Sequence, residues 1–143
     1  MNLLIVDDEY LVVEEVVTVT DWELLGITEI YSATNAVSAV RILNEKKIDI
    51  MICDIEMPQT DGLELSKKAK ENFPDLEIVM LTSHAEFNYV RNALRYGCYD
   101  YLLKPVMEDD IIKVMKNLVT KIERERHQAQ LQEEGIVWNQ LKP

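Results

Sequence analysis

Short apolar runs alternate along the chain with segments in which apolar residues recur every three or four positions. Runs typical of buried or half-buried strands lie at about 3–6, 29–33, 48–53, 77–81 and 99–103. Segments with the periodicity of amphipathic helices lie at about 9–19, 35–43, 63–73, 86–96 and 108–124. This alternation predicts an α/β fold in which five helices doubly wind a five-stranded parallel sheet to form a three-layer sandwich.

The apolar run that ends at Cys53 is followed at once by a carboxylate, Asp54. A short run without a polar face is typical of a strand that is covered on both sides in a parallel sheet. Pro58 and Gly62 come next, and these residue types mark a loop. Because ligands of such sheets bind beyond the carboxyl ends of the strands, Asp54 is expected at the functional edge.

Four of the predicted strands are followed by chemically active side chains. These side chains are carboxylates, a hydroxyl and an ammonium: Asp7, Asp8, Asp54, Thr82 and Lys104. Carboxylates crowded at one edge repel one another, and a hard divalent cation such as Mg²⁺ relieves that repulsion. With a lysine and a hydroxyl beside it, such a site suits a phosphoryl group, and an aspartate can form an acyl-phosphate. Each carboxylate alone could instead cap the next helix, but the agreement of all five residues favours a site.

Local signals predict where several elements begin and end. Asn35 is expected to cap the second helix, and Gly97 is expected to end the fourth. The segment 20–26 should end the first helix. The alternation of polar and less polar residues at 29–33 predicts a half-covered strand toward the edge of the sheet.

Beyond Arg124 the apolar positions of the last helix give way to a segment rich in Gln and Glu. This composition predicts a solvated helical linker that is broken at Gly135. We therefore divide the chain into a domain over 1–124 and a helical linker over 125–143. The apolar residues 136–138 would belong to whatever follows the linker.

Composition narrows the function. The net charge of −11 over 143 residues argues against binding nucleic acid unaided, because that requires a basic face. The sequence has neither a stretch that could span a membrane nor the plan of a signal peptide, so a cytoplasmic location without membrane association is expected. Cys53 and Cys98 lie in apolar or aromatic surroundings and are expected to be reduced core thiols, with a disulfide as the alternative.

In their order along the chain, these residues resemble the receiver domain of a two-component response regulator. The resemblance covers about 2–124, and its motifs are Asp7-Asp8, the segment 54–62 (Asp-Ile-Glu-Met-Pro-Gln-Thr-Asp-Gly), Leu81-Thr82-Ser83 and the segment 100–105 (Asp-Tyr-Leu-Leu-Lys-Pro). The segments 21–26 and 83–87 further resemble receivers that are joined to an AraC-type helix-turn-helix DNA-binding domain. The resemblance implies a flavodoxin-like sheet with strand order 2-1-3-4-5.

By this resemblance Asp54 is the phospho-acceptor, and the protein is a signalling switch, not an enzyme with an external substrate. Mg²⁺ would be held by Asp54, by Asp8 directly, by Asp7 mostly through water, and by the main-chain carbonyl of Glu56. The side chain of Glu56 departs from the usual pattern because it adds a negative charge beside the site.

The resemblance also assigns the parts of the switch and its partners. Thr82 and Lys104 would bind phosphoryl oxygens, and Thr82 together with Tyr101 would form the switch. We expect the Lys104–Pro105 bond to be cis, since the chain must turn abruptly there. The expected partners are a sensor histidine kinase and a second copy, which would bind the face of the fourth helix, fifth strand and last helix after phosphorylation. DNA would be bound only through the missing output domain, whose action would be transcriptional.

Two alternatives stay open at this stage. A phosphohydrolase of the haloacid dehalogenase type also combines an aspartyl nucleophile, Mg²⁺, a threonine and a lysine. That family places two aspartates two residues apart after its first strand, whereas Asp7 and Asp8 are adjacent here, and no cap insertion is evident. The other alternative is a stand-alone receiver without DNA binding, and the sequence beyond Pro143 would decide that question.

Overall fold

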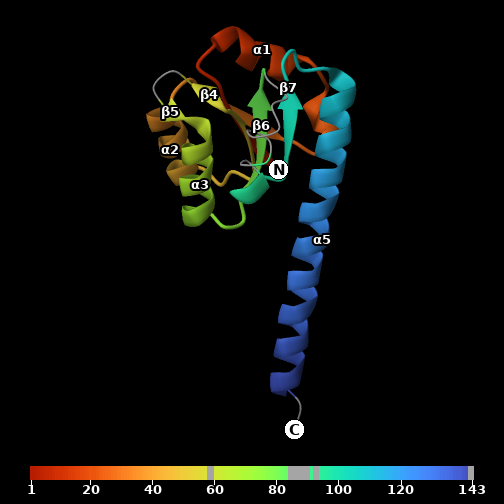
Figure 1. Cartoon of the computed structure of the whole chain (residues 1–143). Helices are drawn as coiled ribbons and strands as arrows, with labels where there is room; N and C mark the ends of the chain where they lie inside the picture. The colour runs from red at the N-terminus through yellow and green to blue at the C-terminus, as the bar shows by residue number, and fades with distance from the viewer. Residues whose placement is uncertain (58–59, 84–90, 92–93, 142–143) are drawn as a thin grey trace.

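The structure, a computed structural model, describes residues 1–57, 60–83, 91 and 94–141 of the chain. Its centre is a five-stranded parallel sheet in the order β2-β1-β3-β6-β7, which confirms the predicted topology (Figure 1). The strands are Asn2–Val6 (β1), Glu29–Ala33 (β2), Ile50–Asp54 (β3), Glu77–Thr82 (β6) and Asp100–Leu103 (β7). A short antiparallel hairpin follows β3 and consists of Glu56–Met57 (β4) and Thr60–Asp61 (β5).

Helices cover both faces of the sheet, as the three-layer prediction requires. The described helices are Tyr10–Thr18 (α1), the 3₁₀ helix Trp22–Leu25 (η1), Ala36–Glu45 (α2), Gly62–Asn72 (α3) and Glu108–Leu141 (α5). Buried residues of α2 and α3 form one apolar cluster with Leu4 and Val6 of β1. Residues of α1 and α5 form the opposite cluster with Leu3 and Ile5. The alternation of side chains along β1 therefore divides the core into two layers.

Local chemistry explains several element boundaries. The Asn35 side chain accepts a hydrogen bond from the Ser38 N–H at 2.8 Å, which confirms the predicted cap of α2. After α1 the chain forms η1, and the buried Trp22 indole donates to the Val16 carbonyl at 3.1 Å. Strand β2 is half-exposed and lies at the edge of the sheet, as its alternating sequence predicts.

The predicted fourth helix, 86–96, falls largely on residues outside the described part of the chain. Arg91, Leu94 and Arg95 are described, and they are helical and exposed. Gly97 follows with a φ of 86°, a left-handed conformation that glycine adopts readily at helix ends.

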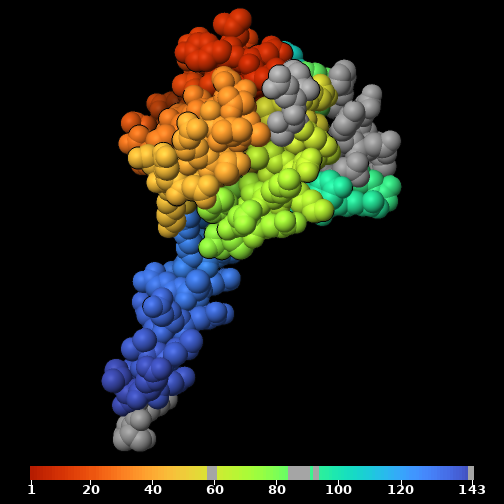
Figure 2. Space-filling view, turned by 90° about the vertical axis from the view of Figure 1, so that its left-hand side faces the viewer, coloured from red at the N-terminus to blue at the C-terminus, as the bar shows by residue number. Residues whose placement is uncertain are grey.

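The last helix is longer than expected. α5 is a single 34-residue helix, so the predicted break at Gly135 is wrong. Glycine costs an exposed helix only about 1 kcal/mol relative to alanine, and the hydrogen bonds of neighbouring turns offset that cost. The second half of α5 projects beyond the sheet (Figures 1 and 2). Its apolar side chains Ile136, Val137 and Trp138 are 59%, 50% and 63% exposed.

Two further expectations concern the core thiols and the membrane. Cys53 and Cys98 are free and buried, as predicted. Among the described helices, none combines the length and apolar character needed to cross a bilayer.

Candidate functional site at the carboxyl edge of the sheet

The parallel register of the sheet brings the predicted site residues to one edge. Val6 pairs with Cys53, so Asp7, directly after β1, lies level with Asp54, the last residue of β3. Asp54 pairs with Leu81 and Thr82 pairs with Leu103, which places Thr82 and Lys104 at the same edge. The arrows of β6 and β7 end at this edge in Figure 1.

The three aspartates form a compact cluster. One carboxylate oxygen from each of Asp7, Asp8 and Asp54 lies within 4.8 Å of the others. Asp7 and Asp54 are 0% and 1% exposed, whereas Asp8 is accessible to solvent. Backbone N–H groups fix the two buried carboxylates: Glu9 donates to Asp7 Oδ1 at 2.9 Å, and Glu56 donates to Asp54 Oδ1 at 3.1 Å. Of the three carboxylates, that of Asp8 is therefore the one that solvent reaches.

Lys104 provides the positive charge of the site. Its Nζ lies 2.8 Å from Asp7 Oδ2 and 3.4 Å from Asp54 Oδ1. Burial lowers the pKa of Lys104, but the close carboxylates of Asp7 and Asp54 outweigh burial, so the pKa is raised overall. The ammonium therefore stays protonated at neutral pH and can pair with an anion at Asp54.

The environment of Asp54 opposes ionisation. Burial, the largest effect, and the neighbouring charge of Asp7 raise the pKa of Asp54 to about 6. The Glu56 N–H and the Lys104 ammonium oppose this rise but do not cancel it. One lysine thus does not compensate the crowded carboxylates, and the site favours an additional cation.

The donor set fits a hard divalent cation. Asp7 Oδ2 is buried and accepts no hydrogen bond of good geometry from the described residues, although Lys104 is close enough to form an ion pair with it. Carboxylate oxygens are the ligands that Mg²⁺ prefers, and it usually retains several waters. Asp8 is accessible to solvent, so water can reach the cluster. Receiver-type magnesium binding is therefore compatible with these side chains.

Thr82 and Glu56 are linked across the site. Thr82 is 0% exposed, and its Oγ1 donates to Glu56 Oε1 at 3.5 Å, the outer limit of a hydrogen bond. Tyr101 pairs with Met80 in the sheet and packs, partly buried, against the α2–α3 side of the core. The Lys104–Pro105 bond is cis, the isomer that the sequence analysis expects. Thr82, Glu56 and Lys104 therefore lie around the aspartates, whereas Tyr101 lies further back along β7, level with Met80.

Gly62 is a site residue whose role the sequence analysis missed. Its residue type predicts a loop, but in the structure it is the first residue of α3. An ideal Cβ at Gly62 would lie 2.0 Å from the Asp54 carbonyl oxygen and 2.9 Å from the Ile55 Cα. Glycine is needed here because the β4–β5 hairpin folds back onto the backbone of Asp54, a contact that only the folded chain reveals.

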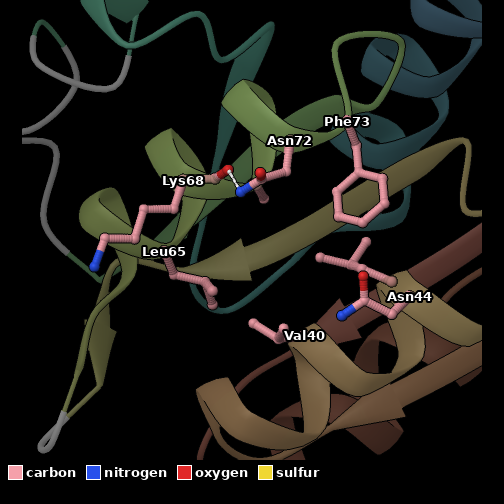
Figure 3. Close-up of a pocket in the computed structure, with 8 residues that line it drawn as sticks. Val40, Asn44, Leu65, Lys68, Asn72 and Phe73 are labelled. Atoms are coloured by element: carbon pink, nitrogen blue, oxygen red, sulfur yellow. Dashed lines mark hydrogen bonds between the residues drawn. The ribbon is translucent and has the colours of Figure 1, made fainter.

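A second surface feature lies away from this edge. A groove between α2 and α3 is lined by apolar side chains, two asparagines and a lysine, among them Val40, Asn44, Leu65, Lys68, Asn72 and Phe73 (Figure 3). The carboxylate cluster contributes nothing to its lining. We therefore assign the chemistry to the sheet edge and not to this groove.

The fold and the carboxyl edge of the sheet together define a class of protein: a doubly wound α/β protein with three carboxylates, a threonine and a lysine at the carboxyl ends of its strands. The family described as the response regulator receiver domain matches residues 3–116. The chain therefore belongs to the receiver domain family and to two-component signalling. This assignment removes the haloacid dehalogenase alternative.

Relatives and solved structures agree with this assignment. The chain is 34% identical over 124 residues to an uncharacterized transcriptional regulatory protein, YesN, of Bacillus subtilis, covering 87% of this chain and 34% of YesN. It is 32% identical over 127 residues to the response regulator SaeR of Staphylococcus aureus, covering 89% and 54%. The REC domain of AraT, a response regulator from Geobacillus stearothermophilus, is 30% identical with a TM-score of 0.81, covering 87% and 97%. The chain thus spans a third to a half of these curated relatives but nearly all of the solved receiver domain.

Proposed function

We propose that Asp54 accepts a phosphoryl group from a sensor histidine kinase in an Mg²⁺-dependent reaction. The observation that carries the proposal is the cluster of Asp7, Asp8 and Asp54, whose carboxylate oxygens lie within 4.8 Å of one another. A phosphoryl group adds further negative charge to this cluster, so its transfer needs the ammonium of Lys104 and a bound cation.

In the proposed reaction, a carboxylate oxygen of ionised Asp54 forms a bond to phosphorus. The phosphorus–nitrogen bond of the kinase phosphohistidine breaks, and the imidazole leaves with the electron pair and takes up a proton. Asp7, Asp8, Asp54 and the main-chain carbonyl of Glu56 would hold Mg²⁺, which would supply charge neutralisation at the phosphoryl oxygens. Lys104 would pair with one of these oxygens after giving up its contact with Asp54.

The switch proposal assigns Thr82 to a second phosphoryl oxygen. To reach it, the hydroxyl would leave the carboxylate of Glu56 and turn toward Asp54, and Tyr101 would then occupy the vacated space. The rearranged face of the fourth helix, β7 and α5 would bind a second copy. This response requires that the phosphoryl group favours one of two existing states.

Exposed apolar side chains beside the site support a docking surface for the kinase. Tyr10 and Leu11 follow the acidic segment after β1 and are 61% and 72% exposed. Met107 follows the segment of Lys104 and is 59% exposed. Large apolar groups around an acidic site suit a partner that must exclude water during transfer.

The output of the switch is also part of the proposal. We assign residues 1–124 to the receiver and 125–143 to a linker toward a transcriptional output domain of the AraC type, in a cytoplasmic protein. The similarity to AraT and YesN, together with the short share of YesN that the chain spans, supports a longer parent protein.

Intact-mass spectrometry after treatment with a small phosphodonor tests the function. Wild type should gain one phosphoryl group with Mg²⁺ and none in chelator, and Asp54→Asn should gain none. Asp21→Asn, which removes an exposed carboxylate that precedes η1 and is not part of the cluster, is the matched control and should label like wild type. Labelling of Asp54→Asn, or full labelling in chelator, would contradict the proposal.

A further inference from the structure

Two buried carboxylates lie at the amino-terminal edge of the sheet, opposite the phosphoryl site. Asp49 directly precedes β3, and Glu77 is the first residue of β6. Both are only 7% exposed. The same two strands end at Asp54 and Thr82. A buried carboxylate is costly unless it is paired, so the partners of these two groups are structurally important.

The partner cations of both carboxylates lie on α5. Arg126 forms an ion pair with Asp49 Oδ1, and the Asn2 N–H donates to Asp49 Oδ2 at 2.6 Å. Lys121 Nζ lies 2.9 Å from Glu77 Oε1, whereas Lys70 of α3 lies 3.9 Å from that oxygen. One helix therefore neutralises the far ends of two neighbouring strands.

Apolar packing along α5 ends before the ion pair of Arg126. Ile122 is the last residue of α5 in the buried core. Arg126 lies one turn further on, and the side chains that follow it to Leu141 are exposed. Buried ion pairs are weak evidence for stability but can select one arrangement among several, since any other arrangement leaves a carboxylate unpaired.

We propose that Asp49 and Glu77 are positioning residues that fix the rotation and tilt of the linker helix relative to β3 and β6. By this proposal the first turn of the 125–143 linker, up to Arg126, is anchored to the receiver, and the rest of the linker leaves it in one direction. A second step rests on the proposed function: because β3 and β6 carry Asp54 and Thr82 at their other ends, a shift of either strand reaches the linker through these ion pairs.

Hydrogen exchange of the whole chain tests the positioning role. Arg126→Gln and Asp49→Asn should raise amide exchange over residues 119–134 about tenfold, because the turn beyond the core loses its anchor. Glu125→Gln is the matched control. It removes an exposed ion pair within α5, from Glu125 to Lys121 at 2.9 Å, and leaves the ion pairs to Asp49 and Glu77 in place. The control should change exchange less than about twofold.

A distance measurement gives the direction of the linker. Spin labels on cysteines introduced at Lys47 and Gln132 report the angle of α5, and the natural cysteines are buried. Wild type and Glu125→Gln should give one narrow distance distribution, and Arg126→Gln a broad one. If Asp49→Asn fails to fold, Arg126→Gln still decides, because its side chain is 48% exposed. Unchanged exchange and an equally narrow distribution in Arg126→Gln would overturn the proposal.

Beryllofluoride with Mg²⁺, a mimic of the phosphoryl group, tests the second step. Its binding is followed independently by ¹⁹F NMR. If it binds and shifts the distance in wild type but not in Arg126→Gln, the ion pairs transmit the signal. If it binds and shifts both proteins equally, the second step is wrong, whereas absence of binding contradicts the proposed function and leaves the positioning role supported by the exchange data.

Discussion

Replacing Gly62 by alanine should disturb the site more than any other single-methyl change in the chain that the structure describes. The added Cβ would lie 2.0 Å from the Asp54 carbonyl oxygen, and contacts below 3.0 Å are essentially never observed. The backbones of α3 and β3 must therefore separate by roughly 1 Å. Overpacking of this kind costs typically about 1–3 kcal/mol. The 3.1 Å hydrogen bond from the Gly62 N–H to the Ile55 carbonyl would be strained as well, which adds about 1 kcal/mol.

Urea unfolding followed by circular dichroism measures this cost, which we expect to be about 2–4 kcal/mol. Because a 1 Å displacement at a reacting group can cost about a hundredfold in rate, phosphodonor labelling of the folded variant should slow at least about tenfold. Gly135→Ala is the matched control: its Cβ would meet nothing within 4 Å, so the free energy of unfolding should be unchanged or rise by at most about 1 kcal/mol. Wild-type stability and labelling rate in Gly62→Ala would refute the steric argument.

Three further predictions concern charge and capping. Without bound metal, folding raises the pKa of Asp54 from 3.8 to about 6. The protonated carboxyl is therefore favoured in the folded state, so the contribution of Asp54 to stability is complete below about pH 4 and is lost as the pH rises through 6. At pH 7.5 the free energy of unfolding of Asp54→Asn, measured in urea, should therefore exceed that of wild type by at most about 3 kcal/mol. This difference should vanish near pH 4, and a difference independent of pH would contradict the reasoning. Glu56→Gln should raise the labelling rate with an anionic phosphodonor several-fold, because it removes a negative charge beside Asp54, and an unchanged rate at low salt would argue against that role. Asn35→Ala should lower the free energy of unfolding by about 1 kcal/mol through loss of the α2 cap, whereas no loss would mean that water replaces the side-chain bond.

The sequence predicts the sheet and the site well because both follow from periodicity. The apolar runs place Asp7, Asp54, Thr82 and Lys104 at the ends of four of the five strands, and a parallel sheet must bring such positions to one edge. The cap at Asn35 is equally local, since a side chain and a backbone N–H three residues later suffice for it.

Features that depend on distant contacts could not be predicted. Gly62 looks like an ordinary loop glycine until the β4–β5 hairpin places it against Asp54. Asp49 lies inside an apolar run, and its partner Arg126 is 77 residues away. The error at Gly135 has a different, local cause. One exposed glycine costs a helix only about 1 kcal/mol, so treating every glycine as a helix break overestimates its effect.

Locating the phosphoryl group tests the central claim most directly. Borohydride reduces the acyl-phosphate of an aspartate to homoserine, and peptide mass spectrometry after phosphodonor treatment with Mg²⁺ then identifies the modified residue. The account predicts homoserine at position 54 alone, and none when chelator replaces Mg²⁺. Homoserine at Asp7 or Asp8, or none at position 54 in protein that has gained a phosphoryl group, would contradict it.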